Sequence, residues 1–172
     1  GLAINQGFLF ASMTNGTNVG GTTHMAITVM KINKSNLQII WSKDLASTDA
    51  TTTGVCGGGF VIGCSYGGGI EIDSSGDIFL IGTSRVSNGG NMYTAFAAKM
   101  DSNGSTIWSS KLPIQETSQT NSYPTGMVID KFGNLLISGH IINGNMLGSY
   151  PGGGYDLFLA KIDSNGVFVD GF

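Results

Sequence analysis

The chain has 172 residues, a formal net charge of −3 and only 11% charged residues, far below the ~25% of an ordinary soluble domain. Its surface is therefore expected to be polar but mostly uncharged, with Ser, Thr, Asn and 28 glycines filling the loops. This composition excludes a basic face for nucleic acid, a polybasic stretch for anionic lipid, and the ~18 apolar residues of a membrane span. Because the chain begins at Gly1, we expect a processed product or an excerpt of a longer chain.

Two phrases alternate along the chain, and each occurs three times. The first phrase is GLAINQGFLFASM at residues 1–13, GIEIDSSGDIFLIGTS at 69–84 and GMVIDKFGNLLISGH at 126–140. The second is AITVMKINKSNLQIIWSKDL at 26–45, AFAAKMDSNGSTIWSSKL at 95–112 and LFLAKIDSNGVFVDGF at 157–172. Lys31, Lys99 and Lys161 of the second phrase are 68 and 62 residues apart. A period of this kind predicts a repeat architecture of three units.

Each unit is predicted to contain four strands. The first phrase places two short apolar runs around a turn rich in Asp, Ser and Gly, which suit the backbone of a tight turn. The second phrase repeats this pattern with β-branched and aromatic residues, and no segment has the 3.6-residue period of a helix. We therefore predict twelve main strands in three sheets, residues 95–100 pairing with 106–112, and hairpin turns at residues 6–7, 35–36, 75–76, 103–104, 132–133 and 165–166.

The run GIEIDSSGDIFLIGTS followed by AFAAKMDSNGSTIWS resembles the seven-bladed β-propeller repeat family, whose units read G-I-A-V-D-x-x-G-N-x-Y-V-T-G and F-V-A-K-L-D-x-x-G-x-x-x-W. The resemblance covers almost the whole chain apart from the gaps. It departs from the family at Asn5 and Asn33, where Asp is usual, and at Asp170, where an aromatic residue is usual. It implies a propeller found mostly on secreted and cell-surface proteins, and it implies no catalytic residues.

The expected fold is all-β, with three four-stranded antiparallel blades of a β-propeller-type repeat array that is incomplete as a single ring. The blades are predicted at residues 1–66, including a cysteine loop, at 67–124 and at 125–172, as one continuous repeat domain. Propellers generally have about four to eight blades, so the first and last of three blades would expose apolar faces. Three outcomes stay open: a longer propeller, copies that complete a ring or stack into a filament, or a non-propeller packing of the blades.

Cys56 and Cys64 bracket the sequence GGGFVIG in the gap between the first two blades. In an oxidising compartment we expect them to form a disulfide that closes a short loop, with two free, buried thiols as the alternative. Metal binding would need two further ligands nearby, and none is evident in the sequence.

Three glycosylation sequons occur, at Asn15, Asn33 and Asn103, and all three fall in predicted turns or loops. A glycan at Asn33 or Asn103 is expected to project into solvent from the same hairpin of successive blades. The segment STDATTT at residues 47–53 is a further candidate for O-linked sugar.

The titratable residues do not form a catalytic or metal-binding pattern. His24 precedes one predicted strand and His140 ends another, so the repeat does not place them equivalently, and we interpret both as core or surface residues. The Asp that opens each turn lacks the acidic twelfth residue of an EF-hand loop and is interpreted as the cap of its own turn. Lys99 with Asp101 is interpreted as a pair that fixes a hairpin. No cofactor or metal site is therefore predicted.

All short turns should lie at one end of the blades and all long gaps at the other. Four tyrosines in or beside the gaps, namely Tyr66, Tyr93, Tyr123 and Tyr150, should gather on the long-loop face, a candidate binding surface. Trp41 and Trp108 hold the same blade position and are interpreted as packing residues between blades, with stacking on sugar as the alternative.

The expected function is a non-enzymatic extracellular or cell-surface structural or adhesive module. Its partners are copies of itself or further blades of a longer chain, and neither nucleic acid nor membrane insertion is expected. The alternative is a propeller that recognises carbohydrate or protein through the long-loop face. An enzymatic alternative, a faint resemblance of MDSNGSTIW to quinoprotein propeller repeats, lacks the Thr-Gly that those repeats carry before the Trp.

Overall fold

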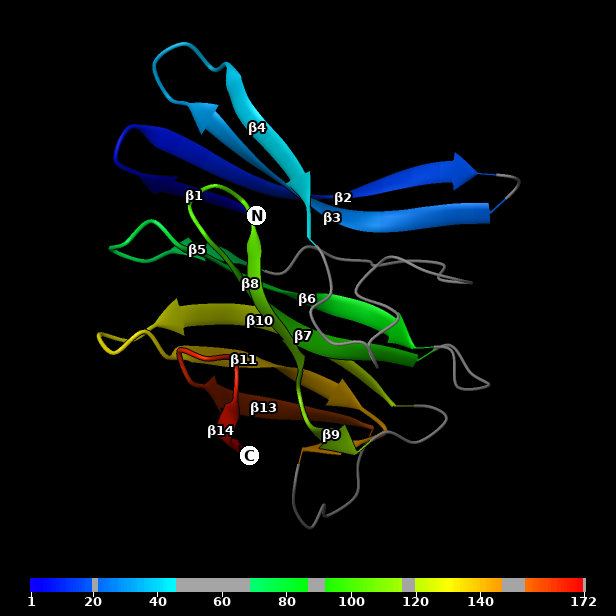
Figure 1. Ribbon diagram of the computed structural model, residues 1–172. Helices are drawn as coiled ribbons and strands as arrows, with labels where there is room; N and C mark the ends of the chain where they lie inside the picture. The colour runs from blue at the N-terminus through cyan, green and yellow to red at the C-terminus, as the bar shows by residue number, and fades with distance from the viewer. Residues whose placement is uncertain (20–21, 46–68, 87–91, 116–119, 147–153, 172) are drawn as a thin grey trace.

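The computed structural model describes residues 1–19, 22–45, 69–86, 92–115, 120–146 and 154–171 (Figure 1). All regular structure in these residues is β-strand, and the sheets are open. No helix occurs among them, and hence none that could cross a bilayer. The prediction of an all-β, antiparallel fold is confirmed.

The first four strands form an antiparallel meander, which we call unit 1. They are β1 (Leu2–Asn5), β2 (Phe8–Val19), β3 (Thr22–Asn33) and β4 (Ile39–Asp44), paired in chain order. Strands β2 and β3 pair without a break from Phe8 opposite Asn33 to Val19 opposite Thr22. The segment TNGTNVGGTTH, predicted as a long gap, is therefore largely strand. Its Thr and Val residues suit a pleated strand, although the segment as a whole reads as polar loop.

The next four strands, β5 (Ile70–Ile72), β6 (Ile78–Val86), β7 (Met92–Met100) and β8 (Thr106–Lys111), form the antiparallel unit 2, again paired in chain order. The predicted pairing of residues 95–100 with 106–112 is confirmed. Unit 3 contains β10 (Asn121–Ile129), β11 (Leu135–Ile142), β13 (Tyr155–Ile162) and β14 (Phe168–Gly171). The two-residue strands β9 (Ile114–Gln115) and β12 (Asn145–Met146) pair with each other.

Units 2 and 3 are joined into one eight-stranded sheet, so the prediction of twelve strands in three sheets is not confirmed. The join is one parallel residue pair, Asn121 of β10 opposite Tyr93 of β7. Side chains extend it: Asn121 Oδ1 accepts a hydrogen bond from Tyr93 N at 3.0 Å, and Ser122 Oγ accepts one from Ala95 N at 2.7 Å. These polar side chains substitute for backbone acceptors along the edge of β7.

The hairpin turns form where the sequence predicts them and gather at one end of the units, on the left in Figure 1. A glycine with φ between 78° and 88° closes five of the turns: Gly7, Gly76, Gly104, Gly133 and Gly166. In four turns the Oδ1 atom of the opening aspartate accepts two backbone hydrogen bonds of 2.8–2.9 Å; these residues are Asp73, Asp101, Asp130 and Asp163. Each aspartate therefore caps its own turn, as predicted.

The three units are equivalent in register as well as in sequence. Lys31 lies opposite Trp41, Lys99 opposite Trp108, and Lys161 opposite Asp170. A register shift follows the lysine in all three units. Each residue near the lysine therefore has a structural counterpart in the other two units.

The three units pack together through two apolar cores, and unit 2 contributes to both. Successive residues of β6 alternate between them: Ile78 and Leu80 belong to the core shared with unit 1, whereas Phe79 and Ile81 belong to the core shared with unit 3. All four are buried, as expected of a strand covered on both faces. The near-continuous apolar runs of the sequence are explained by this double burial.

A tryptophan of each preceding unit packs on the glycine turn of the next. A Cβ atom added at Gly104 would lie 3.1 Å from the Trp41 ring, and one at Gly166 would lie 2.7 Å from the Trp108 ring. Trp108 Nε1 also donates a hydrogen bond of 3.1 Å to Ser164 O. The interpretation of both tryptophans as packing residues between successive units is confirmed.

Candidate functional site

The aromatic surface predicted from the tyrosines forms in part. The ring centroids of Tyr93 and Tyr123 are 6.1 Å apart, and those of Tyr123 and His140 are 5.2 Å apart with nearly parallel planes. All three side chains are half-buried. The cluster lies at the end of the strands opposite the hairpin turns, as the topology predicts. Such a row of rings offers apolar faces for stacking and polar edges for hydrogen bonds.

A bulge in β10 creates this cluster. The register shifts between Pro124 and Gly126, and it is this shift that sets Tyr123 opposite His140. Counting back from the turn without a bulge would place Tyr123 opposite Ile141. Proline has no N–H to donate to the backbone hydrogen bonds of a strand pair, so it is typical of bulges. The presence of Pro124 alone, however, does not predict in which direction the register shifts. His140 was interpreted only as a core or surface residue, and its place in the cluster was missed for this reason.

The two other tyrosines predicted for the binding surface, Tyr66 and Tyr150, lie outside the described residues. Tyr155 begins β13 and is 74% exposed. The predicted face is therefore represented by Tyr93 and Tyr123, with His140 added.

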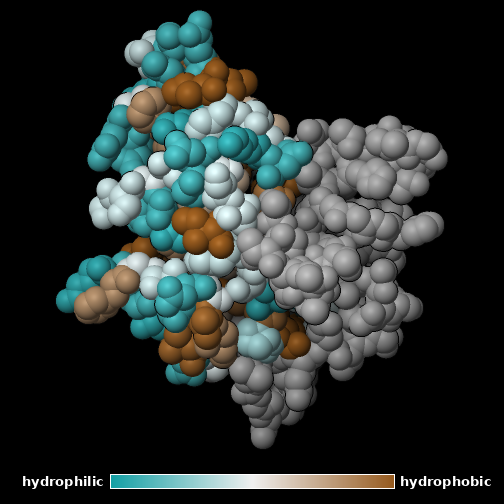
Figure 2. Space-filling view, in the orientation of Figure 1, coloured by the Kyte–Doolittle hydropathy of each residue, from teal (hydrophilic) through white to brown (hydrophobic). Residues whose placement is uncertain are grey.

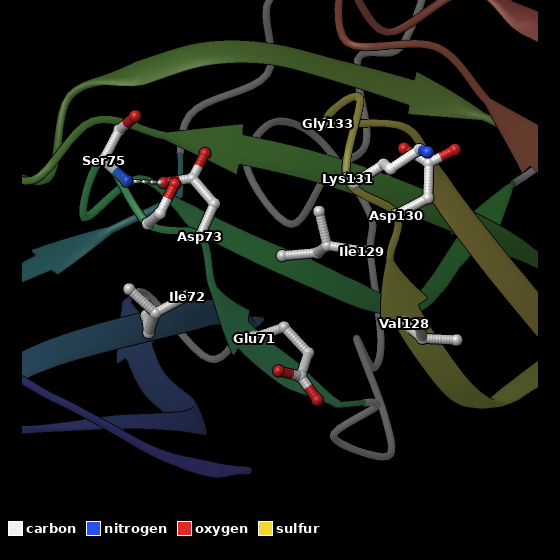
Figure 3. Close-up of a pocket in the computed structure, with 10 residues that line it drawn as sticks. Glu71, Ile72, Asp73, Ser75, Val128, Ile129, Asp130, Lys131 and Gly133 are labelled. Carbon is white, nitrogen blue, oxygen red and sulfur yellow. Dashed lines mark hydrogen bonds between the residues drawn. The ribbon is translucent and has the colours of Figure 1, made fainter.

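A hollow lies between the hairpin turns of units 2 and 3. Figure 3 shows it between the segment from Glu71 to Ser75 and the segment from Val128 to Gly133, and its volume is about 510 Å³. Asp73 and Asp130 line it, but their carboxylates cap their own turns. No group of three or more potential metal ligands occurs in the described part of the chain.

The aspartates at this hollow are also paired with lysines of the neighbouring hairpin. Lys99 Nζ is 2.8 Å from Asp77 Oδ2 and 3.8 Å from Asp73 Oδ2, and Lys161 Nζ is 3.8 Å from Asp130 Oδ2. Lys99 and Asp101 both fix hairpins, as interpreted from the sequence, but Asp101 caps its own turn and Lys99 pairs with the aspartates of another hairpin. The lysine reaches the first hairpin of its unit because β6 pairs with β7, which brings Lys99 beside the strand that follows Asp77.

Asp130 is the one described group with a resolved shift in acidity. A hydrogen bond from Asn134 Nδ2, at 2.7 Å, is the largest cause that lowers the pKa of Asp130. Desolvation, the second-largest effect, raises the pKa, whereas the backbone N–H groups of Asn134 and Phe132 and the nearby Lys161 lower it further. These contacts stabilise the charged carboxylate and identify it as part of the turn.

The modification sites fall at three kinds of position. Asn15 lies within β2, opposite Ala26, so its predicted loop position is wrong because the hairpin of β2 and β3 extends past it. Asn33 ends β3, and its Oδ1 atom accepts hydrogen bonds from the N and Oγ atoms of Ser35. Asn103 is exposed in the turn between β7 and β8.

Cys56, Cys64 and residues 47–53 lie outside the described residues. His24 lies within β3 rather than before a strand.

The two outer faces of the stack carry exposed apolar side chains. On unit 1, Leu2 and Ile4 are 67% and 60% exposed. On unit 3, Leu157 is 86% exposed, and a hollow of about 170 Å³ lies between Leu136 and Leu159. Figure 2 shows hydrophobic side chains at both ends of the stack, over β4 at the top and over β13 and β14 at the bottom. These surfaces are the strongest candidates for macromolecular contact.

No family model matches this chain, and no curated protein matches it.

Proposed function

We propose that this chain is a non-enzymatic structural or adhesive module of the β-propeller repeat type, secreted or displayed at the cell surface. Units 1, 2 and 3 are its blades, and the eight-stranded sheet represents two blades whose edges meet at one residue pair. The observation that carries the proposal is the presence of an apolar face at each end of the stack. Leaving several large apolar side chains in water forgoes about 1.5–3 kcal/mol for each that would be fully buried.

Sedimentation velocity over a range of protein concentrations tests this proposal. We expect species larger than the 17.8 kDa monomer, in a proportion that rises with concentration. The thermal unfolding midpoint should rise as well, because association stabilises the folded chain by mass action. A monodisperse monomer whose unfolding does not depend on concentration would contradict the proposal.

The extracellular setting rests on the low charge and on the pair Cys56 and Cys64, which we propose to be a disulfide. Peptide mapping of the native protein without reductant tests this pairing. A single linked peptide that contains both residues is expected, and free thiols at both positions would refute the disulfide.

Intact mass of protein from its natural source, before and after glycosidase, tests the sequons at Asn15, Asn33 and Asn103.

A second candidate function is recognition of carbohydrate through the aromatic cluster. It is favoured by the ring geometry at Tyr93, Tyr123 and His140. A glycan array probed with the chain should give saturable binding that the Tyr123→Ala variant loses. The Tyr155→Ala variant serves as the control. Tyr155 is also an exposed tyrosine, but among the described ring pairs it does not stack on Tyr93, Tyr123 or His140. Equal binding by both variants and the unaltered chain would exclude the cluster as the site.

A further inference from the structure

The two internal joints provide a template for what can cover the outer faces. We call the side of a unit that faces the next unit its forward face, and the opposite side its rear face. At the first joint the forward face of unit 1 presents Phe10, Ile27, Val29 and Trp41 to the rear face of unit 2, which contains Ile78, Leu80, Ala98 and Met100. At the second joint the forward face of unit 2 presents Phe79, Ala95, Ala97 and Trp108 to the rear face of unit 3, which contains Leu135, Ile137, Ala160 and Ile162. The same positions are used both times.

The outer faces are the two unpaired halves of this same joint. The forward face of unit 3 carries Leu136, Leu157 and Leu159, which occupy the positions of Phe79, Ala95 and Ala97 in unit 2. The rear face of unit 1 carries Leu9, Ala11, Met30 and Ile32, which occupy the positions of Ile78, Leu80, Ala98 and Met100. Leu2 and Ile4 extend it on β1, in register with Ala11 and Leu9. Within the described part of the chain, a forward face and a rear face of matching chemistry are therefore both without a partner unit.

The tryptophan contact, however, is replaced at both ends. Asp170 occupies the position of Trp41 and Trp108 and is exposed. In the turn of unit 1, which is one residue longer, Leu37 has φ 58° at the place of the glycine. Leu37 therefore carries a side chain at the place where Gly104 and Gly166 have none and lie against a tryptophan ring. A third joint therefore cannot repeat the stacking of tryptophan on glycine.

The two ends instead carry residues of opposite charge, Asp170 on unit 3 and Lys34 on unit 1. The second turn residue is Ser102 in unit 2 and Ser164 in unit 3, and its carbonyl oxygen accepts from the preceding unit: from Lys31 Nζ at 3.4 Å and from Trp108 Nε1 at 3.1 Å. In unit 1 the second turn residue is Lys34, which is exposed. A unit seated on unit 1 in the geometry of the second joint, where Trp108 contacts Ser164, sets its residue at the tryptophan position against this lysine. When that unit is unit 3 of another copy, the residue is Asp170.

We propose that the forward face of unit 3, formed by Leu136, Leu157 and Leu159, docks on the rear face of unit 1 of a second copy of this chain, with Asp170 against Lys34. The contact is heterologous, so repetition gives a ring if the rotation closes and a fibre if it does not. The proposal rests on the function proposed above and deepens it, since it names the occupant and the polarity of both outer faces. Opposite charges at the edge of the contact set its register and disfavour other arrangements.

Blocking one face at a time tests the polarity of the contact. Leu157→Glu places a charge on the forward face of unit 3, and Leu2→Glu places one on the rear face of unit 1. Both side chains are largely exposed, so the monomer should fold in both variants, and circular dichroism checks this. Each variant alone should sediment as a monomer of 17.8 kDa, whereas an equimolar mixture should give a dimer of twice that mass and nothing larger. Self-association of either variant alone, or a mixture that stays monomeric, would overturn the proposal.

Charge reversal tests the pair at the edge. Asp170→Lys or Lys34→Asp should weaken association about tenfold at low salt, and the double variant should recover most of that affinity, since the two charges exchange places. Lys131→Asp is the matched control, because Lys131 is an exposed lysine in a turn of unit 3 that lines the hollow between units 2 and 3. If the two reversals weaken association additively in the double variant, Asp170 and Lys34 are not in contact.

These outcomes separate the inference from the function on which it rests. If the unaltered chain remains a monomer at every concentration, the proposed function fails. If the unaltered chain associates but one face-blocked variant also does so, the structural function stands and the head-to-tail contact is wrong. Association of the unaltered chain with both face-blocked variants monomeric and complementary supports both.

Discussion

At the scale of single residues, two residues of unit 1 make contacts that link it to unit 2. Asn5, where Asp is usual, donates a hydrogen bond from Nδ2 to Asp73 O at 3.2 Å and so connects unit 1 to unit 2. Lys31 of the same unit lies 4.5 Å from the centre of the Phe8 ring and 3.4 Å from Ser102 O. A lysine that is ion-paired within units 2 and 3 thus takes a ring and a neighbouring carbonyl in unit 1.

The role of the turn aspartates was predictable from sequence, whereas the partners of the lysines were not. An Asp two residues before a turn N–H is local information, and its hydrogen bonds follow from the chain itself. The partner of Lys99 depends on which strands lie side by side, and Asp77 is separated from it by a whole hairpin. The sequence indicated that Lys99 helps to fix a hairpin but did not identify Asp77 as its partner.

We predict that Asn134→Ala raises the pKa of Asp130 toward its ordinary value, because the largest stabilising hydrogen bond on the carboxylate is removed. The folded-state pKa of Asp130 is lowered, so its contribution to stability is present above the unfolded pKa near 3.8 and is lost as the pH falls through the folded value. Acid unfolding of the variant should therefore begin at a higher pH.

Carboxyl ¹³C NMR titration of Asp130 measures this shift directly. Asn165→Ala is the control, because Asn165 is exposed in the equivalent second hairpin of unit 3 and donates to Asp163 only through its backbone N–H. An unchanged pKa of Asp130 in Asn134→Ala would show that the side-chain amide is not the main cause.

At the scale of elements, the hairpins follow from the sequence but their lengths do not. Apolar runs around Asp-Ser-Gly turns were sufficient to place the paired strands and their turns. The polar halves of β2 and β3 have few apolar residues to mark them, and they were predicted as loop. The bulge at Pro124 is not marked by any periodicity, and neither is the contact of β10 with β7, where the side chains of Asn121 and Ser122 accept hydrogen bonds from backbone N–H groups of β7.

The turn glycines provide a graded test of the joints. Gly7, Gly104 and Gly166 all have φ near +80°, so an Ala substitution at any of them costs roughly 1–2 kcal/mol of backbone strain. An added Cβ meets nothing within 4 Å at Gly7, the Trp41 ring at 3.1 Å at Gly104, and the Trp108 ring at 2.7 Å at Gly166. We predict that the loss of unfolding free energy increases in the order Gly7→Ala, Gly104→Ala, Gly166→Ala.

Urea unfolding of the three variants measures these losses. Gly154→Ala is the control without either effect, since Gly154 has no positive φ and open space at its Cβ position. Equal destabilisation at all three turns would mean that backbone strain alone is responsible and that the tryptophan contacts are loose.

Trp108→Ala tests the second joint from the other side. The ring is buried and donates a hydrogen bond to Ser164 O, so its removal leaves a cavity between units 2 and 3 and should cost about 3–5 kcal/mol. Trp108→Phe should cost less, because it retains most of the apolar contact and loses only the N–H donor. Calorimetric unfolding distinguishes the two, and a loss under 1 kcal/mol for Trp108→Ala would contradict the proposed joint.

At the scale of the whole molecule, the chain is a stack of three units that share two cores and leave one face unpaired at each end. The threefold repeat predicted both the stacking and the exposed ends, because identical units bury the same faces wherever they meet. The fusion of units 2 and 3 into one sheet was not predictable, since it rests on one residue pair outside the repeated phrases.

Hydroxyl-radical footprinting read by mass spectrometry, over a range of protein concentrations, tests most directly whether both outer faces are covered in the native state. Met13 on the rear face of unit 1 and Leu157 on the forward face of unit 3 report on the two ends, and both are exposed in the single chain. Phe132, 71% exposed in a turn of unit 3, is the internal reference. The oxidation rates of Met13 and Leu157 relative to Phe132 should fall together as concentration rises. Rates that stay constant at both residues across the whole range would contradict the account.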